Sequence, residues 1–321
     1  MVRTAPARSN RAARSAAIAL VAASVLWGTT GTAAAFMPDG VSPLAIGAAT
    51  MGIGGVALFL LTARRAWLAI ADPVARRWLL LGAVGVVAYP LAFYPSMHLA
   101  GVAIGNVVSL GSGPLFAAIL EWTIERRRPG AAWVVATSGA IAGVVLLATG
   151  GHGGRGGTGD IVPGVLLGLV AGAGYALYTY VARRAIAAGH ASTPVMGAMF
   201  GLGAVALIPV LLVTGVGLLE SWRALGIAAY LVVGPMVLAY VLFGVGVRSL
   251  AATTATTITL LEPAVATLLA VAVVGERLTP VAWGGLVLIL AAVAVIAARA
   301  GRAPRPRRDR GRSASTARGI D

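Results

Sequence analysis

Residues 253–298 read TTATTITLLEPAVATLLAVAVVGERLTPVAWGGLVLILAAVAVIAA. The stretch contains two apolar runs, and each is close to the ~20 residues that a helix needs to cross a bilayer. A short polar turn at residues 275–280 joins the two runs, so the pattern predicts a transmembrane helical hairpin. The first arm carries Glu262, followed by Pro263. An ionisable group inside an apolar span is a functional candidate, because it costs free energy unless it faces protein or water.

The composition places the whole chain in a membrane. Of 321 residues, 59% are hydrophobic and only 11% are charged, and the mean hydropathy is +0.90, which leaves too little polar surface for a water-soluble globule. The chain has no cysteine, so it can form neither a disulfide nor a thiolate metal site. The net charge of +15 comes from arginines in short loops and tails. This distribution argues against a nucleic-acid partner and predicts contact with membrane lipids.

Ten hydrophobic segments can be marked along the chain. They are residues 15–36, 44–63, 78–97, 102–122, 131–149, 161–181, 195–213, 225–247, 252–274 and 281–298. Alternate loops then hold 22 and 3 of the 25 arginines, and cytoplasmic loops carry the excess of positive charge. The sequence therefore predicts an all-α polytopic protein of the inner or cell membrane, with ten transmembrane helices and both termini in the cytoplasm. The first segment resembles a signal peptide, but its length predicts a retained helix.

Helix-starting prolines recur at a fixed distance. Ser42-Pro43 and Thr193-Pro194 are expected to open two helices that lie 151 residues apart, and Pro129 and Pro280 repeat the same spacing. Five helices per repeat is an odd number, which predicts two inverted repeats. The expected units are a basic tail at 1–14, a first repeat at 15–149, an exported glycine-rich linker at 150–160, a second repeat at 161–298 and an arginine-rich, disordered tail at 299–321.

The motifs of the opening stretch resemble those of the EamA family, within the drug/metabolite transporter superfamily. The resemblance rests on the Leu261-Glu262-Pro263 step, the Gly275-Glu276-Arg277-Leu278 turn and Gly285. It implies a ten-helix carrier made of two five-helix repeats. The step Leu26-Trp27-Gly28 also looks like the first-helix motif of this family, which favours Trp27 as a binding residue.

Glu262 is the strongest single candidate for binding a substrate or an ion. Thr259 lies on the same helical side and is able to hydrogen-bond the carboxylate, and Thr257 lies just upstream. Pro263 frees a backbone carbonyl one turn back that could serve as a ligand. The alternative is a structural anchor that hydrogen-bonds a neighbouring helix, and the sequence leaves both interpretations open.

The first repeat offers different polar groups at the matching place. A shift of 149 residues puts Gly113 opposite Glu262, and Asn106 and Ser109 supply the polar side chains of that helix, so the site is expected to be asymmetric. Glu121 lies nearer the cytoplasmic end, where an ion pair with residues 126–128 is expected.

Aromatic residues occur in mid-helix in both repeats, and they fill the bundle core or line a substrate cavity. The aromatic binding candidates are Trp27, Tyr94, Tyr175 and Tyr178.

Small residues recur every four positions in two of the segments. Rows of this kind let helix backbones approach closely in lipid. The predicted helix-packing residues are Gly101, Gly105, Gly113, Gly164, Gly168 and Gly172, together with the helix prolines Pro114 and Pro263. Close packing and function are compatible, because closely packed helices are also those that move past each other in transporters.

These features predict a secondary transporter that exports small metabolites, such as amino acids or amphipathic organic compounds. The chain contains no ATP-binding P-loop and no metalloprotease motif, and its three histidines lie in or beside separate loops. We therefore expect no enzyme activity, no cofactor and no metal. The expected partners are a small-molecule substrate, membrane lipids and protons, and the sequence specifies no oligomeric state. A passive pore and a membrane scaffold are the alternative functions.

Overall fold

The computed structural model describes residues 6–126, 131–150, 161–249, 258–259 and 261–300, and these residues form helices joined by short turns. The helices of the first half are α1 (Pro6–Gly28), α2 (Thr30–Ala35), α3 (Pro43–Ala48), η1 (Ala49–Ile53), α4 (Gly54–Leu61), α5 (Ala63–Ala71), α6 (Pro73–Ala100), α7 (Val102–Gly111), α8 (Gly113–Glu125) and α9 (Ala131–Gly150). Those of the second half are α10 (Ile161–Ala187), α11 (Ser192–Thr214), α12 (Val216–Leu219), α13 (Trp222–Leu231), η3 (Val232–Leu238), α14 (Ala239–Ser249), α16 (Leu261–Leu269), η4 (Ala270–Val274) and α17 (Pro280–Ala300).

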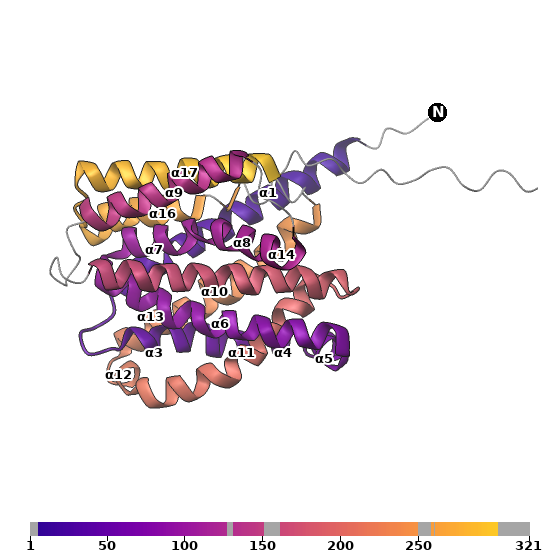
Figure 1. Ribbon diagram of the computed structural model, residues 1–321. Helices are drawn as coiled ribbons and strands as arrows, with labels where there is room; N and C mark the ends of the chain where they lie inside the picture. Colours follow the sequence, from indigo (N-terminus) through magenta and orange to yellow (C-terminus); the bar gives the residue numbers. More distant parts are fainter. Residues whose placement is uncertain (1–5, 127–130, 151–160, 250–257, 260, 301–321) are drawn as a thin grey trace, which may run out of the picture.

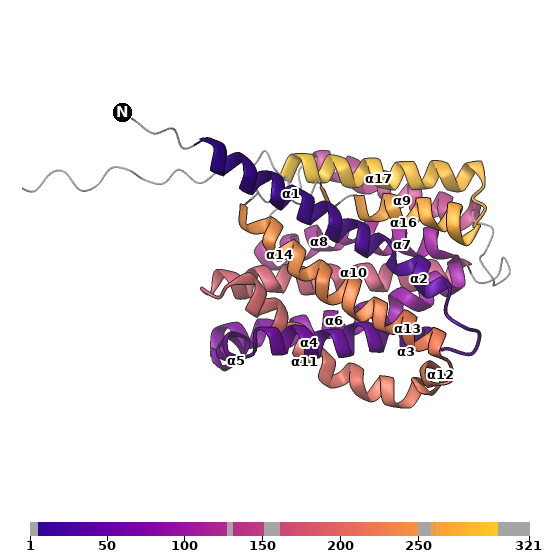
Figure 2. The same ribbon diagram turned by 180° about the vertical axis from the view of Figure 1, so that it is seen from behind.

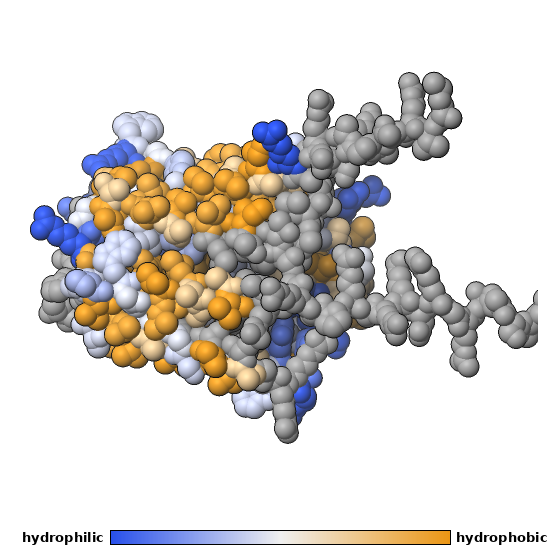
Figure 3. All heavy atoms as spheres, turned by 90° about the horizontal axis from the view of Figure 1, so that it is seen from above, coloured by the Kyte–Doolittle hydropathy of each residue, from blue (hydrophilic) through white to orange (hydrophobic). Residues whose placement is uncertain are grey.

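Most of these helices run roughly along one direction, as Figures 1 and 2 show. Helix α10 packs along α6, and α17 packs along α9, so helices from the two halves of the chain are neighbours throughout the bundle. Short helix α5 turns across one end of the bundle, the end from which the N-terminal part of α1 projects. In Figure 3 apolar side chains cover the middle of the visible surface, and hydrophilic side chains lie toward its two ends, as expected for a bilayer-embedded protein.

Seven stretches of the described chain are long and apolar enough to cross a membrane. They are Arg14–Ala35, Pro43–Leu61, Pro73–Ala100, Val102–Glu125, Ile161–Ala187, Ser192–Thr214 and Trp222–Gly246. Two shorter apolar helical stretches, Leu261–Val274 and Pro280–Ala292, follow in the second half. The all-helical membrane class is thus confirmed, whereas the count of ten spanning helices stays a prediction.

Helix starts follow their capping residues. Ser42 caps α3 by accepting a hydrogen bond from the Leu44 amide at 3.3 Å, with Pro43 at the first helical position, as the sequence predicts. Thr279 accepts from the Ala282 amide at 3.2 Å and Pro280 opens α17. The prediction that Thr193-Pro194 opens a helix is wrong by two residues, because α11 begins at Ser192 after Ala191 and Pro194 is its third residue.

Several of the predicted continuous segments are interrupted. The segment at 102–122 is divided at Ser112 into α7 and α8, and Pro114 at the start of α8 cannot donate the hydrogen bond that would continue the helix. Segments in both halves contain a π-helical turn: η1 in the first, and η3 and η4 in the second. Such turns occur mostly as single bulges and are frequent at functional sites.

Candidate functional site

Glu262 lies in the first turn of α16 and is partly exposed. Helix α1 packs directly against this segment. A Cβ added to Gly28 would come within 2.7 Å of Val265 and 3.0 Å of the Glu262 carbonyl oxygen. The Ser24 hydroxyl donates to the Ile258 carbonyl at 3.4 Å, one turn before Glu262. The backbone that carries the Glu262 carboxylate therefore lies where α1, from the first half of the chain, packs against the second half.

A chain of aromatic contacts connects most of the aromatic candidates. In the first half, Tyr94 contacts Phe93 at 5.4 Å between ring centroids, and Phe93 stacks on Tyr89 at 5.0 Å. From there Tyr89 meets the second half through Tyr175 at 5.9 Å and Tyr178 at 6.1 Å. The contacts therefore cross from α6 to α10, which belong to different halves.

The same chain of rings continues to the first helix. Tyr178 contacts Phe200 at 5.6 Å, Phe200 contacts Tyr240 at 5.2 Å, and Tyr240 contacts Trp27 at 5.3 Å. The Tyr178 and Tyr240 hydroxyls are 3.4 Å apart. All four predicted aromatic candidates thus belong to one connected group of rings, which we call the aromatic cluster: Trp27, Tyr89, Phe93, Tyr94, Tyr175, Tyr178, Phe200, Tyr240 and Phe243.

Glu262 is electrostatically coupled to this cluster. Its carboxylate lies within Coulombic range of the hydroxyls of Tyr89, Tyr175 and Tyr240. Aromatic rings attract cations through their faces, and a nearby carboxylate adds to this attraction. The arrangement has the chemistry to hold an ammonium group.

Asn106 and Ser109 are polar residues buried on α7. Both residues are 0% exposed, and neither the Asn106 amide atoms nor the Ser109 hydroxyl has a hydrogen-bond partner among the described residues. Buried polar groups are nearly always hydrogen-bonded, so each such group calls for an explanation. At helical spacing the two residues lie between Val102 and Gly113, whose added Cβ would meet the Tyr175 ring at 2.9 Å. This face of α7 therefore leads toward the aromatic cluster.

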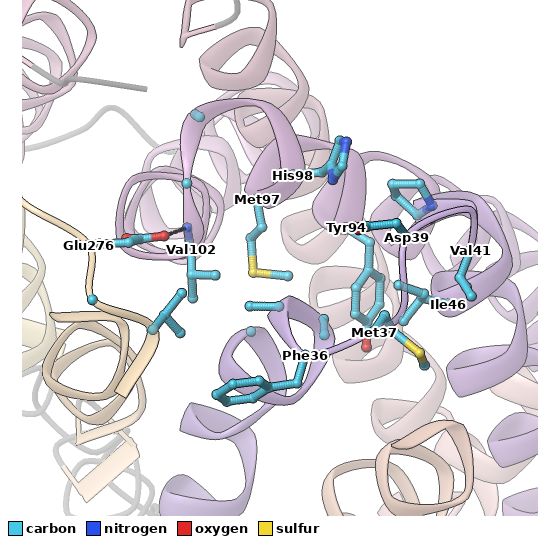
Figure 4. A pocket seen from close by; sticks show the side chains of 18 of the residues that line it. Phe36, Met37, Asp39, Val41, Ile46, Tyr94, Met97, His98, Val102 and Glu276 are labelled. Carbon is cyan, nitrogen blue, oxygen red and sulfur yellow. Dashed lines mark hydrogen bonds between the residues drawn. The ribbon is translucent and has the colours of Figure 1, made fainter. Parts of the chain in front are cut away.

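A cavity of about 720 Å³ opens at the end of the bundle opposite α5 (Figure 4). Its walls come from both halves of the chain and include Tyr94, His98, Val102, Arg223, Glu276 and Arg277. The volume suits a small organic molecule. Tyr94 belongs both to this cavity and to the aromatic cluster, and Asn106 lies one helical turn beyond Val102. Tyr94 therefore joins the wall of the cavity to the aromatic cluster.

Glu276 occupies the wall of this cavity and caps α7. Its carboxylate accepts hydrogen bonds from the backbone amides of Val102 and Ala103, the latter at 3.0 Å (Figure 4). Burial raises the pKa of Glu276 above its ordinary value, against the lowering effect of these two hydrogen bonds. Glu276 is not among the binding residues that the sequence predicts. The sequence does contain one indication of its importance: an acid occurs at the same place in both repeats, because Glu125 precedes Glu276 by 151 residues.

The predicted small-residue rows lie at close helix contacts, with one correction. Added Cβ atoms at Gly164, Gly168 and Gly172 of α10 would come within 3.0 Å of Ala100, Val108 and Ser109, which belong to α6 and α7. Gly105 contacts Met97 in the same way. Gly101, however, is not a packing residue inside a helix: it precedes α7 with φ of 94°, which favours glycine, and it lies against Glu276.

Two other expectations concern residues at the opposite end of the bundle and residues outside the described chain. Glu121 forms an ion pair with Arg183 at 3.0 Å, because α8 and α10 end side by side, and its expected partners Arg127 and Arg128 lie outside the described residues. Thr257 lies outside the described residues, and Thr259 lies beside that gap. In the part of the chain that the structure describes, no cluster of acids and histidines could hold a metal ion.

The fold and site define a helical membrane protein whose two halves meet around a polar and aromatic centre. Residues 14–149 and 162–298 match the EamA-like transporter family. The "Uncharacterized transporter YwfM" of Bacillus subtilis (strain 168) is 34% identical over 280 residues, which cover 86% of this chain and 91% of that protein. A solved crystal structure shares the fold with a TM-score of 0.57 at 22% identity, over 90% of this chain and 98% of that one. The chain belongs to the EamA-like transporter family and is a membrane transporter.

Proposed function

We propose that this protein is a secondary transporter that exports small metabolites bearing an ammonium group, such as amino acids or amphipathic amines. It has ten transmembrane helices in two inverted five-helix repeats, with both termini in the cytoplasm. The aromatic cluster beside Glu262 carries this proposal, because rings from both halves meet there with a carboxylate in electrostatic range. Inverted-repeat transporters bind their substrates at such an interface and expose the site alternately to each side.

The route into this site supports the same mechanism. The cavity reaches Tyr94 and Val102 from one end, and the buried polar groups of Asn106 and Ser109 lie deeper along α7. A substrate that moves between the cavity and the aromatic cluster would supply hydrogen bonds to these groups. These groups are buried in the described structure, so a substrate would reach them only after the repeats move.

Substrate identity is tested first in cells and then in vesicles. Metabolites that accumulate in the medium of an overexpressing strain, but not of a deletion strain, are candidate substrates. In proteoliposomes a carrier exchanges labelled substrate against unlabelled substrate on the other side, so we expect trans-stimulation. A passive pore or a scaffold shows no trans-stimulation, and either result would replace the proposal.

The role of Glu262 is tested separately. We propose that its carboxylate holds the ammonium group of the substrate and exchanges it for a proton as the repeats move. Glu262→Gln keeps the shape and hydrogen bonding of the side chain but cannot titrate. We expect normal membrane insertion, loss of proton-driven transport and loss of its pH dependence, whereas the exposed-acid control Glu220→Gln should behave as the parent protein. Unchanged pH-dependent transport in Glu262→Gln would reject the coupling, and failure to fold would favour the anchor interpretation.

A further inference from the structure

Helix α5 lies across the end of the bundle, between two apolar stretches long enough to span the bilayer (Figures 1 and 2). Its buried face consists of Ala66 and Ala69, both 0% exposed, which pack on the bundle. Its opposite face presents Trp67 and Leu68, which are 64% and 59% exposed. A helix that lies where two spans end, and that leaves a tryptophan and a leucine uncovered, is suited to the membrane surface.

Four exposed arginines lie on α5 and on the adjoining start of α6. Arg64 and Arg65 belong to α5, and Arg76 and Arg77 belong to the first turn of α6. At helical spacing, Arg64, Trp67 and Leu68 share the face that points away from Ala66 and Ala69. Basic and apolar groups therefore alternate on one surface.

The described carboxylates at this end of the bundle pair with other bases. Glu121 pairs with Arg183 at 3.0 Å and Glu125 with Arg184 at 3.8 Å.

Asp72, which follows α5, pairs with His190 at 2.7 Å. Among the residues that the structure describes, no ion pair involves any of the four arginines of α5 and α6. Their positive charge is therefore available to an external anion.

We propose that these six residues form a binding surface for the phosphate headgroups of anionic phospholipids: Arg64, Arg65, Trp67, Leu68, Arg76 and Arg77. Guanidinium groups match phosphate oxygens in charge and in geometry. The exposed Trp67 and Leu68 insert at the boundary between headgroups and acyl chains, which is why they can remain uncovered by protein. The surface acts independently of the transport site and would anchor α5, the helix that connects α4 to α6, during conformational change.

The test measures lipid binding by the full-length protein in detergent. Added phosphatidylglycerol should bind and raise the thermal midpoint, whereas phosphatidylcholine at the same concentration should not. Each arginine near a membrane surface contributes about fivefold in affinity, so Arg64→Gln/Arg65→Gln should weaken phosphatidylglycerol binding by roughly 25-fold. Arg76→Gln/Arg77→Gln should have a similar effect, and salt should weaken binding to the parent protein. The matched control is Arg223→Gln, an exposed arginine at the other end of the bundle, which should bind lipid as the parent does.

One further double variant and a second probe make the outcome decisive. Arg64→Lys/Arg65→Lys keeps the charge and should lose less affinity than the glutamine pair, and it remains informative if the glutamine pair fails to fold. Polyglutamate, which mimics an acidic protein partner, should compete poorly with phosphatidylglycerol. Equal lipid binding by the parent and both glutamine pairs, an equal loss in Arg223→Gln, or preferential binding of polyglutamate would each overturn the proposal.

Discussion

Glu276 and Val102 are joined by a hydrogen bond that crosses between the two halves of the chain. The carboxylate of Glu276 also accepts from Ala103, so one acid from the turn before α17 satisfies two amides at the start of α7. A negative charge at a helix N-terminus is favourable, because the helix dipole and the free amides both point toward it. The contact fixes the wall of the cavity and holds the second repeat to the first.

Removing this charge should loosen the cavity wall. Glu276→Gln keeps one acceptor oxygen but places an amide NH₂ opposite the second backbone donor. Loss of a cap costs about 0.5–2 kcal/mol, so we expect a lower thermal midpoint in detergent. A cysteine introduced at Met97 in this cysteine-free chain should react faster with a membrane-impermeant reagent in the variant than in the parent. Equal midpoints and equal labelling rates would show that the cap does not hold the cavity wall.

The contact between α1 and α16 predicts a strong effect of a single methyl group. In Gly28→Ala the added Cβ would come 2.7 Å from Val265, too close for an undisturbed contact. Overpacking of this kind costs about 1–3 kcal/mol, and here it also displaces the backbone that carries Glu262. We expect reduced stability and reduced transport.

Gly226→Ala in α13 is the matched control, because an added Cβ there meets no atom within 4 Å. The higher helix propensity of alanine should leave this variant as stable as the parent or slightly more stable. If both variants unfold at the same temperature, the close approach of α1 to α16 does not contribute to stability.

The sequence predicts the membrane class and the two-repeat organisation because both depend on local signals. Apolar length shows which segments can span, and prolines with capping residues such as Ser42 mark helix starts. The break at Ser112 and the π-helical turns were not predicted, because they arise from packing between segments and not from hydropathy. The ion pair between Glu121 and Arg183 was not predicted for the same reason: Arg183 is distant in sequence and adjacent only in the folded bundle.

For the candidate site, the sequence likewise predicted which residues take part but not how they are arranged. Residue type inside an apolar span indicated Tyr175 and Glu262, and the resemblance of the Leu26-Trp27-Gly28 step to a family motif favoured Trp27. Their arrangement could not be predicted, because the rings are brought together by helices from both halves. The role of Glu276 as a cap was missed because its partners are backbone amides, which leave no trace in the sequence.

The pair of Asp72 and His190 predicts a pH-dependent contribution to stability. The hydrogen bond from His190 is the largest cause that lowers the pKa of Asp72, followed by that from the Val74 amide. A depressed carboxyl pKa stabilises the fold above the ordinary value of about 4, and this contribution is lost as the pH falls through the lower native value. Asp72→Asn retains a good N-cap but removes the charge.

We therefore expect Asp72→Asn to have a lower thermal midpoint than the parent at neutral pH, with the two curves converging below about pH 4. His190→Gln should give a similar loss at neutral pH, and the double variant should lose less than the sum of the two. A difference between Asp72→Asn and the parent that stays constant from neutral pH to pH 3 would contradict the ion-pair explanation.

Asn106 offers a test that separates binding from folding. Its amide is fully buried without a hydrogen-bond partner among the described residues, and a buried unsatisfied polar group costs roughly 1–3 kcal/mol. Asn106→Leu has a similar size and removes that cost, so the variant should be as stable as the parent or more stable. If the amide serves the substrate in the transport path, the same variant should lose transport.

Ser96→Ala is the matched control, because the Ser96 hydroxyl is equally buried but donates to the Gly164 carbonyl at 2.7 Å. This change removes a satisfied hydrogen bond between α6 and α10 and should lower the thermal midpoint, with transport per folded molecule preserved. Opposite effects of the two variants on stability and on transport are expected only if Asn106 is retained for ligand binding. A destabilised Asn106→Leu protein, or one that transports as the parent does, would assign the amide to the structure of α7 instead.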